Sequence, residues 1–175
     1  MTRLLTVAAL AATLVLPTAA FAQANPGTAA AKAQYDAIKG NLAKAAEMVP
    51  ENLYSFKPTP EVRSFGQLFG HLADGQFGMC GTASGMKPPM SDVEKTMTSK
   101  ADLVKALNAA IAFCDQAFAS MNDTKGMETV QFFFGPTPRL WVLAFNTAHN
   151  NEHYGNLVTY LRINKMVPPS SGGSR

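Results

Sequence analysis

The sequence contains few of the residues that usually reveal a function. Its 175 residues include only two cysteines and three histidines, and charged residues make up 15% of the chain. Outside the first 22 residues, fourteen basic side chains are nearly balanced by twelve acidic ones, and no basic run occurs. This balance argues against a surface for nucleic acid or for an anionic membrane.

Long apolar runs are also scarce, and the chain has only one. Leu4 to Leu16 follows the charged start Met1-Thr2-Arg3 and is followed by the small-residue segment Ala20-Phe21-Ala22. This order is typical of a secretory signal peptide. About thirteen apolar residues are too few to span a bilayer, and no cysteine directly follows them for a lipid anchor. We therefore predict a signal peptide at residues 1–22, cleaved after Ala22 or Ala24.

Export implies a periplasmic or secreted protein with no membrane anchor after cleavage. The mature chain of about 150 residues suits one domain with a sizeable core. In an oxidising compartment, the even cysteine count favours a disulfide between Cys80 and Cys114. Two buried free thiols are the alternative.

Apolar residues recur at three- and four-residue steps in four segments. These predict helices near residues 28–48, 64–80, 99–121 and 137–166. Together they define one domain over residues 28–167, followed by a flexible tail at 168–175.

Recognisable signals mark the ends of these helices. Ser64 with Gln67 matches a capping box, and Ser99 with Asp102 is a similar start. Thr137-Pro138 suggests a cap followed by proline in the first turn. The apolar run Val130–Phe134 is either a strand or an aromatic cap. With no credible sheet, the pattern predicts an all-α four-helix bundle.

The spacing of two histidines is the first functional signal. His149 and His153 lie four residues apart on a predicted helix, so their side chains project from one face. This spacing allows two imidazoles to bind the same ion. Val142 and Phe145 lie near that face, which suggests that it looks into the bundle.

The third histidine, His71, flanks the apolar stripe of the second helix. Gly75 and Gly78 lie on its side and would leave space for an ion, a water or a substrate. Cys80 is nine residues further and points away from His71, so it suits a bridge to the third helix better than a metal. Spacing alone leaves two interpretations open, a three-histidine metal site or ordinary hydrogen-bonded histidines.

The segment His149–His153 also matches the H-x-x-E-H string of inverted zinc peptidases, with Glu152 as the general base. Glu152, however, points about 100° away from His153 on a helix. No distinct carboxylate ligand follows on a later helix. The peptidase interpretation is therefore not favoured.

Three segments resemble the DinB/YfiT-like metalloenzyme family over essentially the whole mature chain. They are Pro58–Gln67 leading into His71, His153–Arg162, and Val167–Ser170. The resemblance implies a four-helix bundle in a mirror variant of the up-and-down arrangement. It also implies one divalent metal held by His71, His149 and His153.

Homodimers are common in this family, so a homodimer is a further expectation. Its members include isomerases and S-transferases that depend on low-molecular-weight thiols. Those thiols are cytoplasmic, whereas this chain carries a predicted export signal. The resemblance therefore does not settle the reaction.

Three neutral imidazoles would leave a metal with an open position, as in catalytic zinc sites. Zn²⁺ is the expected ion, with Ni²⁺ second. Tyr160, Asn146 and Asn156 are candidates for orienting the histidines or a substrate.

The first functional hypothesis is a metal-dependent hydrolase or transferase that acts on an unknown small molecule. The second is a non-catalytic, stress-related metal-binding protein. The third is a structural helical module without metal.

Overall fold

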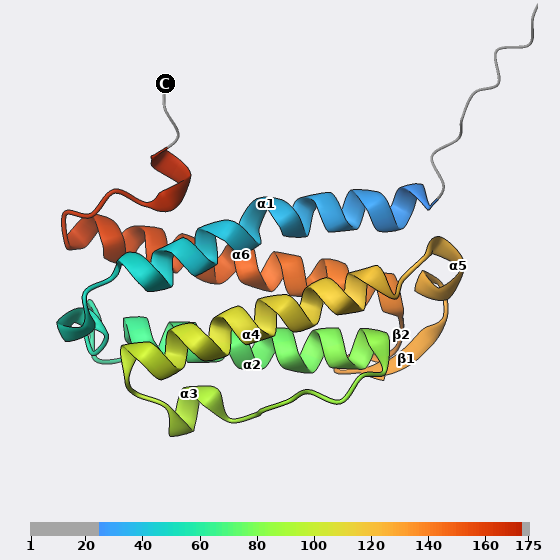
Figure 1. Ribbon diagram of the computed structural model, residues 1–175, viewed down its shortest axis with the longest axis horizontal. Helices are drawn as coiled ribbons and strands as arrows, with labels where there is room; N and C mark the ends of the chain where they lie inside the picture. Colours follow the sequence, from blue (N-terminus) through green and yellow to red (C-terminus); the bar gives the residue numbers. More distant parts are fainter. Residues whose placement is uncertain (1–24, 173–175) are drawn as a thin grey trace, which may run out of the picture.

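Four long helices make up most of the chain in the computed structural model, which describes residues 25–172 (Figure 1). They are α1 (Pro26–Met48), α2 (Phe65–Ser84), α4 (Lys100–Ala119) and α6 (Arg139–Ile163). α2 packs against α4 and α6, and α1 packs against the same two helices. All four predicted helices are present. The signal peptide predicted at residues 1–22 lies outside the described residues.

The helix ends follow the capping signals in the sequence. Ser64 Oγ accepts the backbone N–H of Gln67 (3.2 Å), and Gln67 Oε1 accepts the backbone N–H of Ser64 (2.9 Å), which confirms the capping box. Ser99 Oγ similarly accepts the N–H of Asp102. α2 ends where Gly85 adopts a positive φ of 83°, a conformation that glycine allows without steric cost.

A short antiparallel hairpin corrects the expectation of no sheet. β1 (Thr129–Phe132) pairs with β2 (Gly135–Pro138), and Thr137 lies opposite Val130. The expectation that Thr137-Pro138 opens the last helix is therefore wrong, because both residues belong to β2 and α6 begins at Arg139.

The apolar run 130–134 combines both of its proposed structures. Its first part is in strand β1, and Phe132 also packs against Phe145 of α6 with ring centroids 5.7 Å apart. Phe133 and Phe134 extend from the hairpin into solvent.

Four short helices occupy the connections and the end of the chain. They are η1 (Glu51–Leu53), α3 (Val93–Thr96), α5 (Asp123–Gly126) and η2 (Pro169–Ser171). η2 lies within the segment expected to be a flexible tail, yet the N–H of Ser170 donates to Tyr154 Oη (2.9 Å). The tail is thus held against the domain at this point, and residues 173–175 lie outside the described range.

One apolar core fills the space between the long helices. Its largest fully buried side chains come from all four helices: Tyr35, Leu42, Phe65, Phe69, Leu72, Phe77, Leu103, Leu107, Leu143, Leu157 and Leu161. Within residues 25–172, no helix combines the length and apolarity needed to cross a membrane.

A disulfide joins α2 to α4 inside this core. Cys80 and Cys114 are bonded, with their Cα atoms 5.2 Å apart and both residues fully buried. This confirms the pairing expected from the sequence. A buried bridge of this kind indicates an oxidising compartment.

Replacing both Cys80 and Cys114 with Ala should lower the free energy of unfolding by about 3–4 kcal/mol, because the bridge closes a 34-residue separation in the unfolded chain. Urea unfolding with and without reductant would measure this. The unchanged protein should lose a similar amount in reductant, while the double variant should be insensitive to it. Equal stability of the oxidised and reduced protein would contradict this account.

Candidate metal centre

The three histidines converge where α2 and α6 pack side by side. His71 projects from α2, and His149 and His153 project from successive turns of α6. Each offers a ring nitrogen, and these three atoms lie within 4.8 Å of one another. Nε2 of His71 and Nε2 of His149 are 3.1 Å apart. The structure thus brings together all three residues predicted as ligands.

The spacing of these nitrogens suits a small divalent ion. In a tetrahedral site with metal–nitrogen bonds of 2.0–2.1 Å, two ligand nitrogens are about 3.3 Å apart. The His71–His149 separation of 3.1 Å is close to that value. Three imidazoles are also a donor set that Zn²⁺ and Ni²⁺ accept. The cluster could therefore hold one metal ion.

Gly75 makes the close approach of His149 possible. A Cβ atom at Gly75 would lie only 2.7 Å from Cε1 of His149, whereas one at Gly78 would have nothing within 4 Å. The expectation that both glycines leave space for a ligand is therefore corrected at Gly75. The space beside this residue belongs to the imidazole of His149.

Glu94 completes the cluster and was missed in the sequence. Its Oε2 lies 3.0 Å from Nδ1 of His71, and its Oε1 accepts a hydrogen bond from Nε of Arg63 (2.9 Å). A carboxylate at this position accepts the Nδ1–H of His71, which leaves a lone pair on Nε2, the nitrogen that faces His149. Carboxylate–histidine pairs of this kind orient metal ligands in many proteins.

The short helix α3 carries Glu94 and lies directly on α2 (Figure 1). The carboxylate of Asp74 on α2 accepts the backbone N–H groups of Val93 and Glu94, each at 2.9 Å. A Cβ at Gly70 would lie 2.6 Å from the Cα of Glu94, so a glycine is required there. Only the folded contact between α3 and α2 reveals Glu94, since nothing in its own spacing marks it.

Burial keeps the α6 histidines neutral at pH 7. The pKa of His149 is lowered to about 4, first by burial and then by the nearby His153, His71 and Arg63. The pKa of His153 is also lowered, first by burial and then by His71. A neutral imidazole is the form that binds metal. Nδ1 of His149 is buried and has no hydrogen-bond partner among the described residues.

The three residues expected to orient the site lie in different places. Asn156 Nδ2 lies 3.4 Å from Nδ1 of His153, beside the cluster. The Tyr160 hydroxyl donates to the carbonyl oxygen of Arg63 (2.9 Å) and so ties the loop before α2 to α6. Asn146 is fully buried, with Nδ2 directed at Cys114 Sγ (3.8 Å), on the disulfide.

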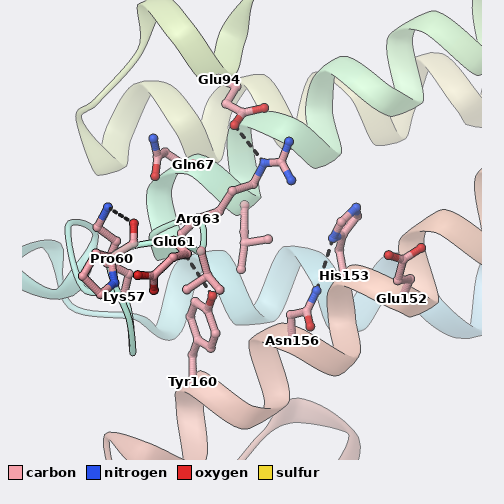
Figure 2. Close-up of a pocket in the computed structure, with 12 residues that line it drawn as sticks. Lys57, Pro60, Glu61, Arg63, Gln67, Glu94, Glu152, His153, Asn156 and Tyr160 are labelled. Carbon is pink, nitrogen blue, oxygen red and sulfur yellow. Dashed lines mark hydrogen bonds and ion pairs between the residues drawn. The ribbon is translucent and has the colours of Figure 1, made fainter.

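A pocket of about 630 Å³ opens beside His153 (Figure 2). It lies between the loop before α2, the first turn of α2, α3 and α6. Its lining is mostly polar and consists of Lys57, Pro60, Glu61, Val62, Arg63, Gln67, Leu68, Glu94, Glu152, His153, Asn156 and Tyr160. The carboxylate of Glu152, also in this lining, forms no hydrogen bond or ion pair within residues 25–172. The volume suits a small molecule.

Long helices around a half-buried histidine cluster define a helical protein with a candidate metal centre. The model of the DinB superfamily matches residues 34–157, and the chain belongs to this superfamily.

Two solved structures share the fold. A DinB-like protein from Bacillus cereus ATCC 10987 has a TM-score of 0.70 and 16% sequence identity, and the match covers 79% of this chain and 93% of that one. A DinB-like protein from Bacillus subtilis has a TM-score of 0.61 and 17% identity with the same coverage. At these identities the likeness shows the fold alone. No curated protein matches the chain.

Gly75→Ala should weaken binding of Zn²⁺ by at least about tenfold, because the new methyl group displaces the ring of His149. Helix stability itself should not fall, since alanine is the better helix former. Gly78→Ala is the matched control on the same helix and should leave affinity unchanged. Competition with a chromogenic chelator would measure both variants, and equal affinities would contradict the role given to Gly75.

The metal-free protein should lose stability as the pH falls from about 6.5 towards 4. The pKa of His149 is about 4 in the folded chain against 6.5 as an ordinary value. Between these values the unfolded chain binds more protons, so acid favours unfolding. The loss should be on the order of 2 kcal/mol, with allowance for a partly exposed ring. Urea unfolding in chelator across this range would test it, and His149→Gln should flatten the slope.

Proposed function

We propose that this DinB-superfamily protein binds one divalent metal ion through His71, His149 and His153. We propose further that it acts as a metal-dependent hydrolase or transferase on a small molecule held in the adjacent pocket. The observation that carries the proposal is the convergence of three ring nitrogens within 4.8 Å. Zn²⁺ is the proposed ion, with Ni²⁺ second. We assign the fold to the four-helix bundle in its mirror variant.

The protein's own groups prepare the site in two ways. Glu94 accepts the Nδ1–H of His71 and so leaves a lone pair on its Nε2, and burial keeps His149 and His153 neutral, which is the form that binds metal. A bound divalent ion supplies a Lewis acid with an open position. The pocket reaches His153, and Asn156 beside it offers an amide to a substrate.

A non-catalytic, stress-related metal-binding protein is the second candidate. The histidines come from α2 and α6, so an ion would also hold these two helices together. A structural module without metal is the third, in which His71 and His149 are joined by a hydrogen bond between their Nε2 atoms.

The proposed location is the periplasm or the exterior of the cell, reached through the signal peptide at residues 1–22. The buried disulfide supports an oxidising compartment. The partner we propose is an unidentified small-molecule substrate. Nucleic acid and a membrane anchor after cleavage are not part of the proposal, and homodimerisation stays an expectation from the family resemblance.

Elemental analysis of the mature protein, purified without chelators or an affinity tag, tests the metal proposal. We expect about one ion per chain and its loss when His71, His149 and His153 are all replaced by Ala. Added Zn²⁺ or Ni²⁺ should raise the melting temperature of the metal-free protein. Metal-free protein whose melting temperature does not respond to either ion would exclude both metal hypotheses.

His153→Ala separates a functional ion from a structural one. Loss of the metal with an intact circular dichroism spectrum and cooperative unfolding would favour the functional site. Collapse of the fold would instead favour a helix clamp.

Glu94→Gln should weaken Zn²⁺ binding by about 10- to 100-fold, because Gln replaces the charged acceptor that orients His71. Glu152→Gln is the control, since Glu152 lines the same pocket but is not part of the histidine cluster. Affinity measured by chelator competition should fall only in the first variant. An unchanged affinity in Glu94→Gln would remove this residue from the site.

A further inference from the structure

We propose that Arg63 binds an anionic group of the substrate, so that the substrate is a small molecule with a carboxylate or phosphate group. This inference rests on the proposed function, because it places that group in the pocket beside the histidines. It assigns a substrate-binding residue to a site that is otherwise defined only by the three histidines.

The guanidinium of Arg63 has hydrogen-bond donors without a partner among the described residues. Its Nε bonds Glu94 Oε1 (2.9 Å), while neither terminal nitrogen has a hydrogen-bond partner among residues 25–172. The side chain is 42% exposed and lines the pocket. A guanidinium with two free terminal nitrogens matches the two oxygens of a carboxylate or phosphate.

The position of Arg63 is fixed relative to the histidines. Its carbonyl oxygen accepts the Tyr160 hydroxyl (2.9 Å), which ties its backbone to the helix that carries His153. Its side chain is held by Glu94, the same carboxylate that contacts His71. Figure 2 shows the guanidinium reaching from the loop towards the side of the pocket where His153 lies. An anion between the two would therefore meet a preorganised donor.

The charges in the pocket favour an anion at this end. Glu94 supplies one negative charge, shared between Arg63 and His71. A divalent ion on three neutral histidines would add two positive charges and would give the inner end a surplus of positive charge.

The acids elsewhere in the pocket restrict where the anion can lie. Glu61 and Glu152 are exposed pocket residues, and their negative charges disfavour an anionic group beside them. Lys57 is held by the carbonyl oxygen of Pro60 (3.0 Å). Arg63 is therefore the cation best placed to receive an anionic group near the histidines.

Calorimetric titration with inorganic phosphate and with succinate tests this proposal on metal-loaded and metal-free protein. We expect at least one of the two anions to bind. Arg63→Gln should raise the dissociation constant of that anion by about tenfold or more. The two arms show whether phosphate or carboxylate is preferred. Arg139→Gln is the matched control, because Arg139 forms an equivalent Nε–carboxylate pair with Glu128 (3.0 Å) outside the pocket. It should bind the anion as the unchanged protein does.

The metal content of each sample separates the possible failures. Retained metal with weakened anion binding in Arg63→Gln supports the proposal. Loss of metal together with the anion would overturn it in favour of Arg63 as a support for Glu94. Unaltered binding in Arg63→Gln, or no binding of either anion to the unchanged protein, would also overturn it. Failure of the proposed metal site gives a different result, because the unchanged protein itself would then contain no metal.

Discussion

The close approach of His149 to α2 is the contact on which the rest of the site depends. The imidazole lies in space that any side chain at position 75 would fill, and this brings its Nε2 to within 3.1 Å of His71. The approach has a cost, since Nδ1 of the same ring is buried without a partner among the described residues. A buried polar atom without a partner lowers stability, and such exceptions are typical of functional sites.

α3 imposes the second constraint, and α2 positions it. Gly70 lets the backbone of α3 approach, and Asp74 fixes it with two hydrogen bonds, so one face of α2 both carries His71 and positions its carboxylate partner. Glu94 in turn meets Arg63, which Tyr160 ties to α6. α2, α3, α6 and the loop before α2 are therefore held in place by contacts with one another. These contacts restrict movement of the pocket wall nearest the histidines.

Local features were predictable from the sequence, and contacts between distant segments were not. The His149–His153 pair and the Ser64 capping box depend on neighbours within one helix, so their spacing was sufficient. Helix phase also separated Cys80 from His71 and directed it to α4. Whether His71 meets α6 depends on helix packing, which only the family resemblance supplied.

Other features were missed for equally physical reasons. Glu94 lies on a helix of four residues whose position is set by Asp74, so no periodicity marks it. Thr137-Pro138 suits both a helix start and an edge strand, and pairing with β1 decided between them. The hairpin that results also orders the exposed aromatic residues after β1.

Two links join α2 to later helices, the His71–His149 contact to α6 and the disulfide to α4. His71 and His149 are 78 residues apart, and the disulfide lies within that interval. Once it has formed, only nine residues to Cys80 and thirty-five from Cys114 separate the two histidines along the shortest path. Closing this shorter loop in the unfolded chain costs about 0.5 kcal/mol less in chain entropy, so the disulfide also makes it easier for His71 and His149 to meet during folding.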